Sequence, residues 1–245
     1  MGTVLSIDLA CRSSRDFGLC LLEVQGQKPP TVRFLKPDEM NLEEEPRADD
    51  YAHAISCFLR REGVSVLLLD GPQGWKDPES DLEYRYCEKI LNAQAKTGIA
   101  NQVKPKNFTR FVEFSISLFE HLTTLCGTLV ECSTPAVPPD GFLLVESYPR
   151  SAWCKLDLPP LPGKKKAKPA DVKRGVDALE QLNSLRISQP PTHDELSALV
   201  AGLAGVAILG GNTSGYIAQG TPPKKVAGVI LEGFIVNPCL AKKAA

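Results

Sequence analysis

The chain has 245 residues, of which 43% are hydrophobic and 23% charged, so it is long enough for one large domain with a full core and short for two. We therefore expect residues 1–245 to form a single domain. The 28 Lys and Arg residues nearly balance the 29 Asp and Glu residues. This balance excludes the strongly basic composition typical of many nucleic-acid-binding proteins, so any basic surface must be local.

The eight cysteines contain no C-x-x-C pair, which argues against a structural zinc site. Cys20 and Cys57 lie inside apolar runs, where small buried residues are expected. The amino terminus has no basic region before its apolar run, and no apolar run approaches the roughly 20 residues that span a bilayer. We expect a reduced, cytoplasmic protein with no membrane partner, and its oligomeric state stays open.

Three short apolar runs near the amino terminus predict strands at residues 3–10, 17–24 and 31–35. Only short turns separate these runs, which is typical of antiparallel pairs. Residues 46–61 have apolar side chains at helical spacing, and the continuous apolar run 64–69 predicts a strand that is buried on both faces.

The rest of the chain predicts mainly helices. Thr192 and Glu195 form a capping-box sequence that opens the clearest helix. The other expected elements are helices at 79–95, 108–125 and 172–185, a strand at 142–146, an exposed loop rich in Pro, Gly and Lys at 158–169, and a strand or hairpin at 226–236.

This order, β-β-β-α-β followed by helical insertions, a strand and a helix, favours an RNase H-like α/β fold. In that fold a mixed sheet of three antiparallel strands followed by parallel strands is flanked by helices. An alternating Rossmann order fits worse, because the first three strands leave no room for helices between them. We expect five strands, with strand 3–10 central and beside strand 64–70.

Four acidic residues follow or interrupt these predicted elements. Asp8 lies inside the first strand, Asp70 ends the buried strand, Glu146 ends a later strand, and Asp194 is in the first turn of the capped helix. Strand ends in an open α/β sheet are where ligand sites form, and an acid in an apolar strand needs a partner. We expect Asp8, Asp70 and Asp194 to hold Mg²⁺ or Mn²⁺, with Glu146 as a fourth catalytic acid.

Each acid also has a structural interpretation. Asp8 could accept hydrogen bonds from turn amides, Asp70 precedes Gly-Pro and could be a turn residue, and Glu146 could be an exposed edge acid. Asp194 could only complement the helix dipole. The joint placement of the four acids is what favours a site.

Three further residues are candidates for binding a substrate. His193 could orient water or a leaving group, although a solvated histidine at a helix start is common. Lys165 lies in the run of lysines at 164–168 and could contact phosphate, although such a run usually forms a solvated loop. Arg85 is three residues before Glu88, and a surface ion pair is the alternative interpretation.

Several short motifs in order resemble domain-of-unknown-function family 429, a family of predicted RNase H-like nucleases. They are SIDLA, LLLDGPQGW, RYCE, VESYPRSAW, HDELSALVAGLAG and LEGFIVNP, and they extend over roughly residues 3–238. The resemblance implies an RNase H-like fold with a metal-binding acidic site. It also implies that Asp8, Asp70 and Glu146 match the acids of the family motifs.

The last helix is similar to the Asp-x-x-Asp-Ala-Leu pattern of this family and of Holliday-junction resolvases. Asp194 matches the first acid of the pattern, but Ser197 stands where the second is expected. Three functions remain open: a metal-dependent nuclease or related phosphodiester hydrolase, a binding protein that has lost a metal ligand at Ser197, and a nucleotide phosphotransferase of the actin-like class. The last fits worst, because the turn after Asp8 contains no glycine.

Overall fold

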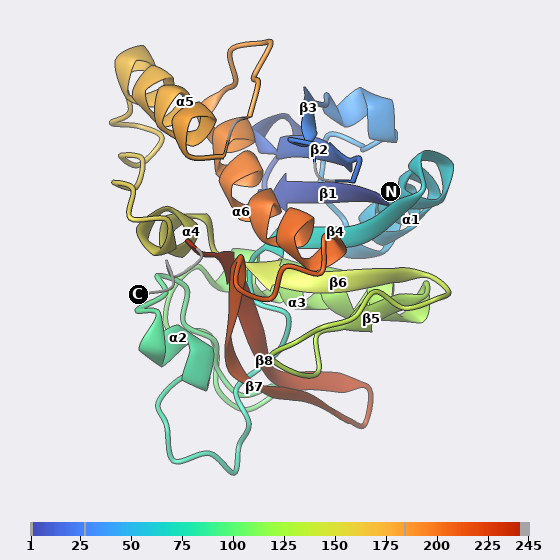
Figure 1. The fold of residues 1–245 in the computed structure, drawn as a ribbon. Coiled ribbons are helices and arrows are strands. Elements are labelled where there is room, and N and C mark those ends of the chain that lie inside the picture. Colours follow the sequence, from blue (N-terminus) through green and yellow to red (C-terminus); the bar gives the residue numbers. More distant parts are fainter. Residues whose placement is uncertain (1, 27, 184, 241–245) are drawn as a thin grey trace.

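The computed structural model describes residues 2–26, 28–183 and 185–240, which form one eight-stranded mixed sheet with helices on both faces (Figure 1). The strands are β1 Gly2–Asp8, β2 Gly18–Val24, β3 Thr31–Phe34, β4 Val64–Asp70, β5 Gly127–Leu129, β6 Phe142–Ser147, β7 Tyr216–Val226 and β8 Val229–Pro238. The helices are α1 Ala48–Glu62, α2 Tyr86–Ile90, α3 Thr109–Thr124, α4 Pro149–Lys155, α5 Pro169–Asn183 and α6 His193–Leu209, with 3-10 turns η1 Ser14–Asp16 and η2 Pro37–Met40.

The sheet has the strand order β3-β2-β1-β4-β6-β8-β7, and β5 pairs with the first residues of β6, Phe142–Leu144, on the edge away from β4. Strands β1, β2 and β3 are antiparallel neighbours, whereas β1, β4 and β6 run parallel. This order confirms the expected RNase H-like mixed sheet with β1 beside β4. The expected number of five strands is wrong, because β5, β7 and β8 extend the sheet.

Strand β7 was not expected, because Pro222 and Pro223 fall inside it. Proline cannot donate a ladder hydrogen bond and is tolerated only at edges and bulges. Within the described part of the chain, β7 is the last strand of the sheet and pairs only with β8, and the register shifts between Thr221 and Lys224, where the two prolines lie. The edge position therefore explains a strand that the sequence pattern argues against.

The helix expected at residues 79–95 is wrong, because only Tyr86–Ile90 is helical. Side chains compete with the helix for backbone amides before it: Asp77 Oδ1 accepts from the Glu79 amide at 3.0 Å, and Ser80 Oγ accepts from Leu82 at 3.3 Å. After the helix, Asn92 has a left-handed φ of 48°. Most of residues 71–107 therefore lack regular secondary structure and pack against the end of the sheet.

The two faces of the sheet build two separate cores. Val4, Val66 and Leu68 point toward α6 on one face, and alternate residues such as Leu5 and Leu67 point toward α1 and α3 on the other. In Figure 1, α6 crosses β1, β2 and β4, while α1 and α3 lie behind the sheet. The central strands β1 and β4 are therefore buried on both faces, as the apolar run of β4 predicts.

The structure also tests the expected helices after residue 170 and the expected burial of the cysteines. The capped helix is confirmed: Thr192 Oγ1 accepts from the Glu195 amide at 3.2 Å, and Glu195 Oε2 accepts from the Thr192 amide at 2.7 Å. The helix expected at 172–185 is α5, although residue 184 lies outside the described residues. All eight cysteines are described and unpaired, with Cys20 buried as expected and Cys57 exposed, contrary to expectation. None of the described helices combines the length and apolar character needed to cross a bilayer.

Candidate acidic site at the end of the sheet

Asp8 and Asp70 are neighbours across two parallel strands. Each is the last residue of its strand, and the two are partners in the register of β1 and β4. The alternation of side chains along these strands directs both carboxyls to the α6 face, where Val4 and Leu68 also point. The chain therefore brings two acids together at the carboxyl edge of the sheet, although 61 residues separate the two strand ends when 8 and 70 are excluded.

Asp194 is held above this pair by the close approach of α6 to β2. Gly18 begins β2 and is the register partner of Asp8. A Cβ atom added at Gly18 would lie 2.0 Å from the backbone oxygen of Asp194. The first turn of α6 thus rests directly on β2, in space that only glycine leaves free, and the charge of Asp194 reaches Asp8.

The two strand-end carboxyls have strongly perturbed acidities. Burial, followed by the charges of Asp70 and Asp194, raises the pKa of Asp8 well above its usual range, and a hydrogen bond with Asp70 adds to the rise. Burial raises the pKa of Asp70 to about 7, against the lowering effect of its hydrogen bond with Asp8. Two buried carboxyls this close to each other disfavour the state in which both are ionised.

A lysine from the loop before α5 neutralises the third acid. Lys164 Nζ lies 2.6 Å from Asp194 Oδ2 and 2.8 Å from Asp16 Oδ1. His193 holds the other oxygen: its Nδ1 is 3.0 Å from Asp194 Oδ1, and its Nε2 is 2.9 Å from the Pro162 carbonyl. Although burial opposes the change, the hydrogen bonds from His193 and Lys164 lower the pKa of Asp194. The loop is exposed as expected, but Lys164 ties it to the acids.

Glu146 lies on the opposite face of β6 from the acid pair. Its carboxylate accepts two hydrogen bonds from Arg85, at 2.8 and 2.6 Å, and one from the Gln73 amide at 2.9 Å. Its charge still contributes to the raised pKa of Asp70. The β6 residue in register with Asp70 is Ser147, one position later. Counting the alternation of side chains from Val145 would have found Ser147 in the sequence.

Arg85 is enclosed, and the interpretation as a surface ion pair with Glu88 is wrong. Its side chain is 1% exposed, and its Nε donates to Glu88 Oε1 at 2.9 Å while its other nitrogens hold Glu146. Glu88 also accepts from the Thr97 amide at 3.1 Å. This buried network fastens residues 71–107 to the sheet.

Two further residues that the sequence singled out, Lys165 and Ser197, do not join the acid pair. Lys165 is exposed on the loop beside Lys164. Ser197, which stands where a second helix acid was expected, is buried, and its hydroxyl donates to the His193 carbonyl at 3.1 Å. Its side chain is therefore engaged within its own helix.

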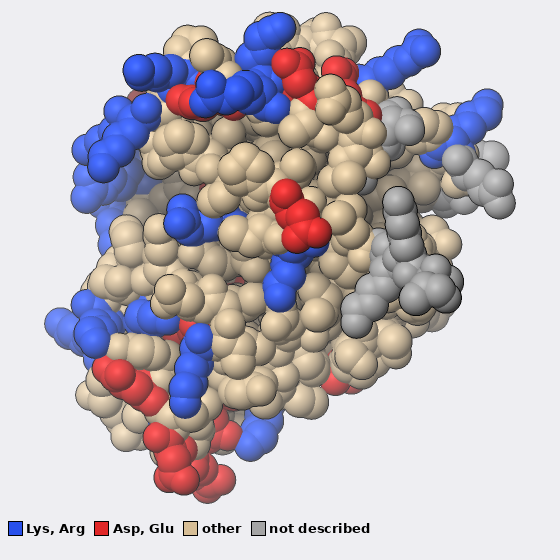
Figure 2. Space-filling view, turned by 60° about the vertical axis from the view of Figure 1, so that its left-hand side comes forward, with Lys and Arg blue, Asp and Glu red and all other residues tan. Residues whose placement is uncertain are grey.

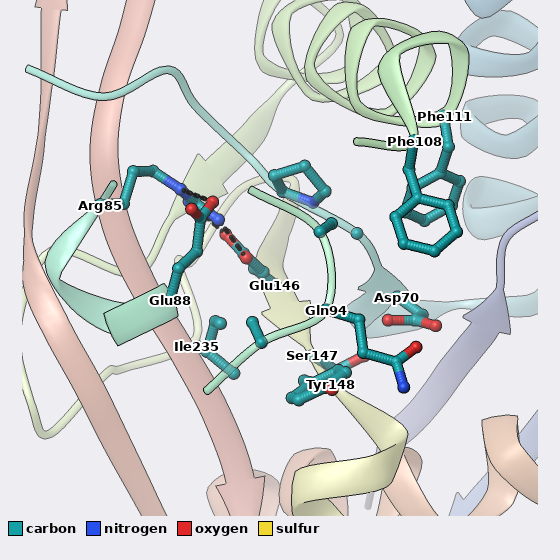
Figure 3. Close-up of a pocket in the computed structure, with 14 residues that line it drawn as sticks. Asp70, Arg85, Glu88, Gln94, Phe108, Phe111, Glu146, Ser147, Tyr148 and Ile235 are labelled. Carbon is teal, nitrogen blue, oxygen red and sulfur yellow. Dashed lines mark hydrogen bonds and ion pairs between the residues drawn. The ribbon is translucent and has the colours of Figure 1, made fainter. Parts of the chain in front are cut away.

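A cavity of about 240 Å³ opens beside Asp70, between the start of α3 and the end of β6 (Figure 3). Phe108 and Phe111 form one wall, and Gln94, Ser147 and Tyr148 lie across from them. The sequence pattern indicated none of these residues as part of a site, although it predicted a helix at 108–125. The Tyr-Pro turn after Glu146 was the one available signal, because strand ends of this kind line sites.

Figure 2 shows the side of the molecule where α4 follows the end of β6, with Lys and Arg side chains gathered along one margin of this face, above and below a hollow. Acidic side chains form separate groups near the top, near the centre and near the bottom of the view. A chain with almost no net charge thus has a locally basic margin.

The donor set at the strand ends suits a hard cation. Mg²⁺ and Mn²⁺ prefer oxygen ligands, and two adjacent carboxyls with raised pKa values offer them. Among the described residues, however, no three His, Cys, Asp or Glu side chains are grouped closely enough to hold a metal ion by themselves. The arrangement therefore fits a cation that also takes ligands from a substrate or from water.

No protein-family model matches the sequence, and no curated protein matches it. Similar solved structures include Thermus thermophilus RuvC, with a TM-score of 0.40 and 12% identity over 86% of this chain and 97% of that chain. The same protein in complex with a Holliday junction substrate gives a TM-score of 0.37 and 11% identity over 86% and 98% of the two chains. With scores this low, the fold class rests on the strand order and register described above.

Proposed function

We propose that this protein hydrolyses phosphodiester bonds in nucleic acid with the help of Mg²⁺ or Mn²⁺. The observation that carries the proposal is the register partnership of Asp8 and Asp70, which brings together two carboxyls with raised pKa values. Two carboxyls that cannot readily ionise together form a place where a cation can replace a proton.

Mg²⁺ is usually held by one or two carboxylates together with substrate phosphates, so Asp8 and Asp70 would be sufficient protein ligands. When bound, the cation would neutralise the phosphate and lower the pKa of water. Asp194 would join the two acids once Lys164 leaves it, and Lys164 and Lys165 would then face the phosphate. His193 would orient Asp194 or a water molecule, and Glu146 would act through its effect on the pKa of Asp70.

Other observations support nucleic acid as the substrate. The basic margin in Figure 2 offers a surface for a phosphate backbone. The motifs that resemble domain-of-unknown-function family 429 point to the same chemistry, and the unpaired cysteines agree with a protein that works in the cytoplasm.

The test compares wild type with Asp8→Asn and Asp70→Asn. Asp140→Asn is a matched control, because this exposed residue lies near the amino end of β6, at the opposite edge of the sheet. Labelled single-stranded, double-stranded and branched DNA and RNA are incubated with Mn²⁺, Mg²⁺ or chelator, and Mn²⁺ binding is measured by calorimetry. We expect both site variants to lose cleavage and cation binding. Equal cleavage by wild type and Asp8→Asn would identify a contaminant and refute the proposal.

A second function, nucleic-acid binding without efficient cleavage, is favoured by the position of Ser197. Its hydroxyl is bonded to the His193 carbonyl, and Asp194 is paired with Lys164, so α6 offers one engaged acid where two were expected. This alternative predicts that wild type binds strands but cuts none. It also predicts that Ser197→Asp gains cation affinity or cleavage, whereas an active wild type would exclude it.

A further inference from the structure

The cavity beside Asp70 has walls of different chemistry. Phe108 and Phe111 supply flat apolar surface on one side, while the hydroxyls of Ser147 and Tyr148 and the amide of Gln94 lie on the other (Figure 3). Arg85, Glu88 and Glu146 close the inner end with their own hydrogen bonds satisfied among themselves and the nearby backbone. The cavity thus has Asp70, one member of the acid pair, in its lining.

Phe108 is presented at this cavity by an unusual backbone. Its φ and ψ of 52° and 32° are left-handed, a conformation that aromatic residues rarely adopt, and the residue is 56% exposed. Backbone conformations of this kind persist where the surroundings fix them, and they gather at functional sites. An exposed ring held by a strained backbone is poorly explained by packing alone.

The two walls are fastened to each other by Asn107. Its Nδ2 donates to the Gln94 carbonyl at 2.7 Å, and its Oδ1 accepts from the Lys96 amide at 3.0 Å. The spacing between the Phe108 side and the Gln94 side is therefore set before any ligand arrives. A site with such fixed walls favours a rigid, flat ligand.

One buried polar atom at the cavity lacks a partner. Among the described residues, the hydroxyl of Ser147, which is 2% exposed, makes no hydrogen bond, whereas the Tyr148 hydroxyl lies beside the Gln94 backbone. Buried polar groups without partners are rare in folded proteins and call for an explanation. A ligand with hydrogen-bonding atoms along its edge would satisfy the Ser147 hydroxyl, whereas a purely apolar ligand would leave it unpaired.

We propose that this cavity binds one nucleobase, stacked on Phe108 with its polar edge toward Ser147 and Tyr148. This inference rests on the proposed function, because Asp70 belongs both to the cavity and to the acid pair where the phosphate would lie. A cavity of about 240 Å³ accepts one ring system and not a base pair. The preferred substrate is therefore a strand with an unpaired nucleotide at the cleavage site.

The test separates the base from the backbone. A short labelled strand made of abasic nucleotides is compared with the same strand carrying one central 2-aminopurine, with Ca²⁺ in place of Mg²⁺ and with strand integrity checked on a gel. Adenosine monophosphate is titrated separately, to distinguish a free nucleotide from a strand as the source of the base. Binding is followed by fluorescence anisotropy, and stacking by the loss of 2-aminopurine emission.

We expect the single base to tighten strand binding by about tenfold, which is the lower range for one base stacked on an aromatic ring. Phe108→Ala should remove this gain, and Phe108→Tyr should keep it. Tyr86→Ala is the matched control, because Tyr86 is exposed but does not line the cavity, and it should also keep the gain. Ser147→Ala with Tyr148→Phe should weaken the base-dependent part while leaving the binding of the abasic strand unchanged.

The outcomes distinguish this inference from the function on which it rests. Equal binding of both strands by wild type overturns the base site and leaves the phosphodiesterase proposal standing. Failure to bind either strand counts against both. Tight binding of adenosine monophosphate, lost in Phe108→Ala, supports the base site and identifies a free nucleotide as its ligand.

Discussion

Asp8 and Gly18 face each other across β1 and β2, and the missing side chain of Gly18 is what lets Asp194 approach Asp8. The register pairs the two residues, and a Cβ at Gly18 would fall 2.0 Å from the Asp194 backbone oxygen. A neutral residue in one strand therefore positions an acid that lies 176 residues later in the chain.

Gly18→Ala should displace the first turn of α6. The added methyl group meets backbone, which cannot rotate away, so we expect a loss of about 1–3 kcal/mol in the free energy of unfolding. It should also weaken Mn²⁺ binding, because Asp194 moves off the acid pair. Gly163→Ala is the control, since a Cβ there meets nothing within 4 Å. Urea unfolding and calorimetry measure the two effects, and an unchanged Mn²⁺ affinity in Gly18→Ala would remove Asp194 from the cation site.

Asp70→Asn should stabilise the protein at high pH. Burial raises the pKa of Asp70 to about 7, from 3.8, so the folded state binds more protons than the unfolded state between these values. The stability of wild type therefore falls as pH rises from about 4 to about 7 and stays low above that. After discounting for the partial exposure of the carboxyl, we expect the variant to gain about 2 kcal/mol at pH 8, or roughly 4–8 °C in Tm, and little at pH 4.

Adding a divalent cation to the same unfolding experiment provides a control. Mg²⁺ or Mn²⁺ at pH 8 should raise the Tm of wild type, because a ligand that binds only the folded state stabilises it, and should raise that of Asp70→Asn much less. A variant that is less stable than wild type at pH 8 would show that the Asp70 carboxylate is stabilising, contrary to its raised pKa.

Arg85→Ala should lower the stability of the fold, because Arg85 holds buried carboxylates and does not contact substrate. The guanidinium is 1% exposed and lies between two buried carboxylates, so its removal leaves Glu88 and Glu146 unpaired, and we expect a loss of about 3–5 kcal/mol. Arg174→Ala, which breaks an exposed pair with Asp171, should cost under about 1 kcal/mol. Thermal unfolding decides the matter: if Arg85→Ala keeps the wild-type Tm but loses strand binding, Arg85 is a substrate ligand after all.

The sequence predicted the middle of the sheet well, because the apolar runs of β1, β2 and β4 are clear and the turns between the first strands are short. It failed at α2 and β7 for local reasons. Side chains of Asp77 and Ser80 take backbone amides that a helix would use, and β7 tolerates two prolines because it is an edge strand. Neither the tertiary partners nor the strand position is visible in a single sequence.

The candidate site was also predicted only in part. Strand ends identified Asp8 and Asp70, and the capping box identified the turn that carries Asp194. Glu146 was expected beside them. It lies one position before Ser147, which is the residue in register with Asp70, so its side chain points to the opposite face of the sheet. Phe108 and Gln94 escaped notice because they reach Asp70 only through the folded path of residues 71–107.

Lys164→Met should raise the affinity for divalent cations. In the structure the Lys164 ammonium lies 2.6 Å from Asp194 Oδ2 and lowers the pKa of Asp8, so it occupies the electrostatic position that a bound cation would need. Methionine keeps the length of the side chain and removes its charge, which frees Asp194 to act as a ligand. We expect Mn²⁺ to bind about 3- to 10-fold more tightly, the change expected for about 1 kcal/mol of lost competition.

Lys165→Met is the matched control, because Lys165 is exposed on the same loop, and calorimetry should give it the wild-type affinity. Cleavage is measured alongside: tighter Mn²⁺ binding with slower cleavage would mean that Lys164 also contacts the phosphate, whereas weaker Mn²⁺ binding in Lys164→Met would show that the lysine supports the acid site and does not compete for it.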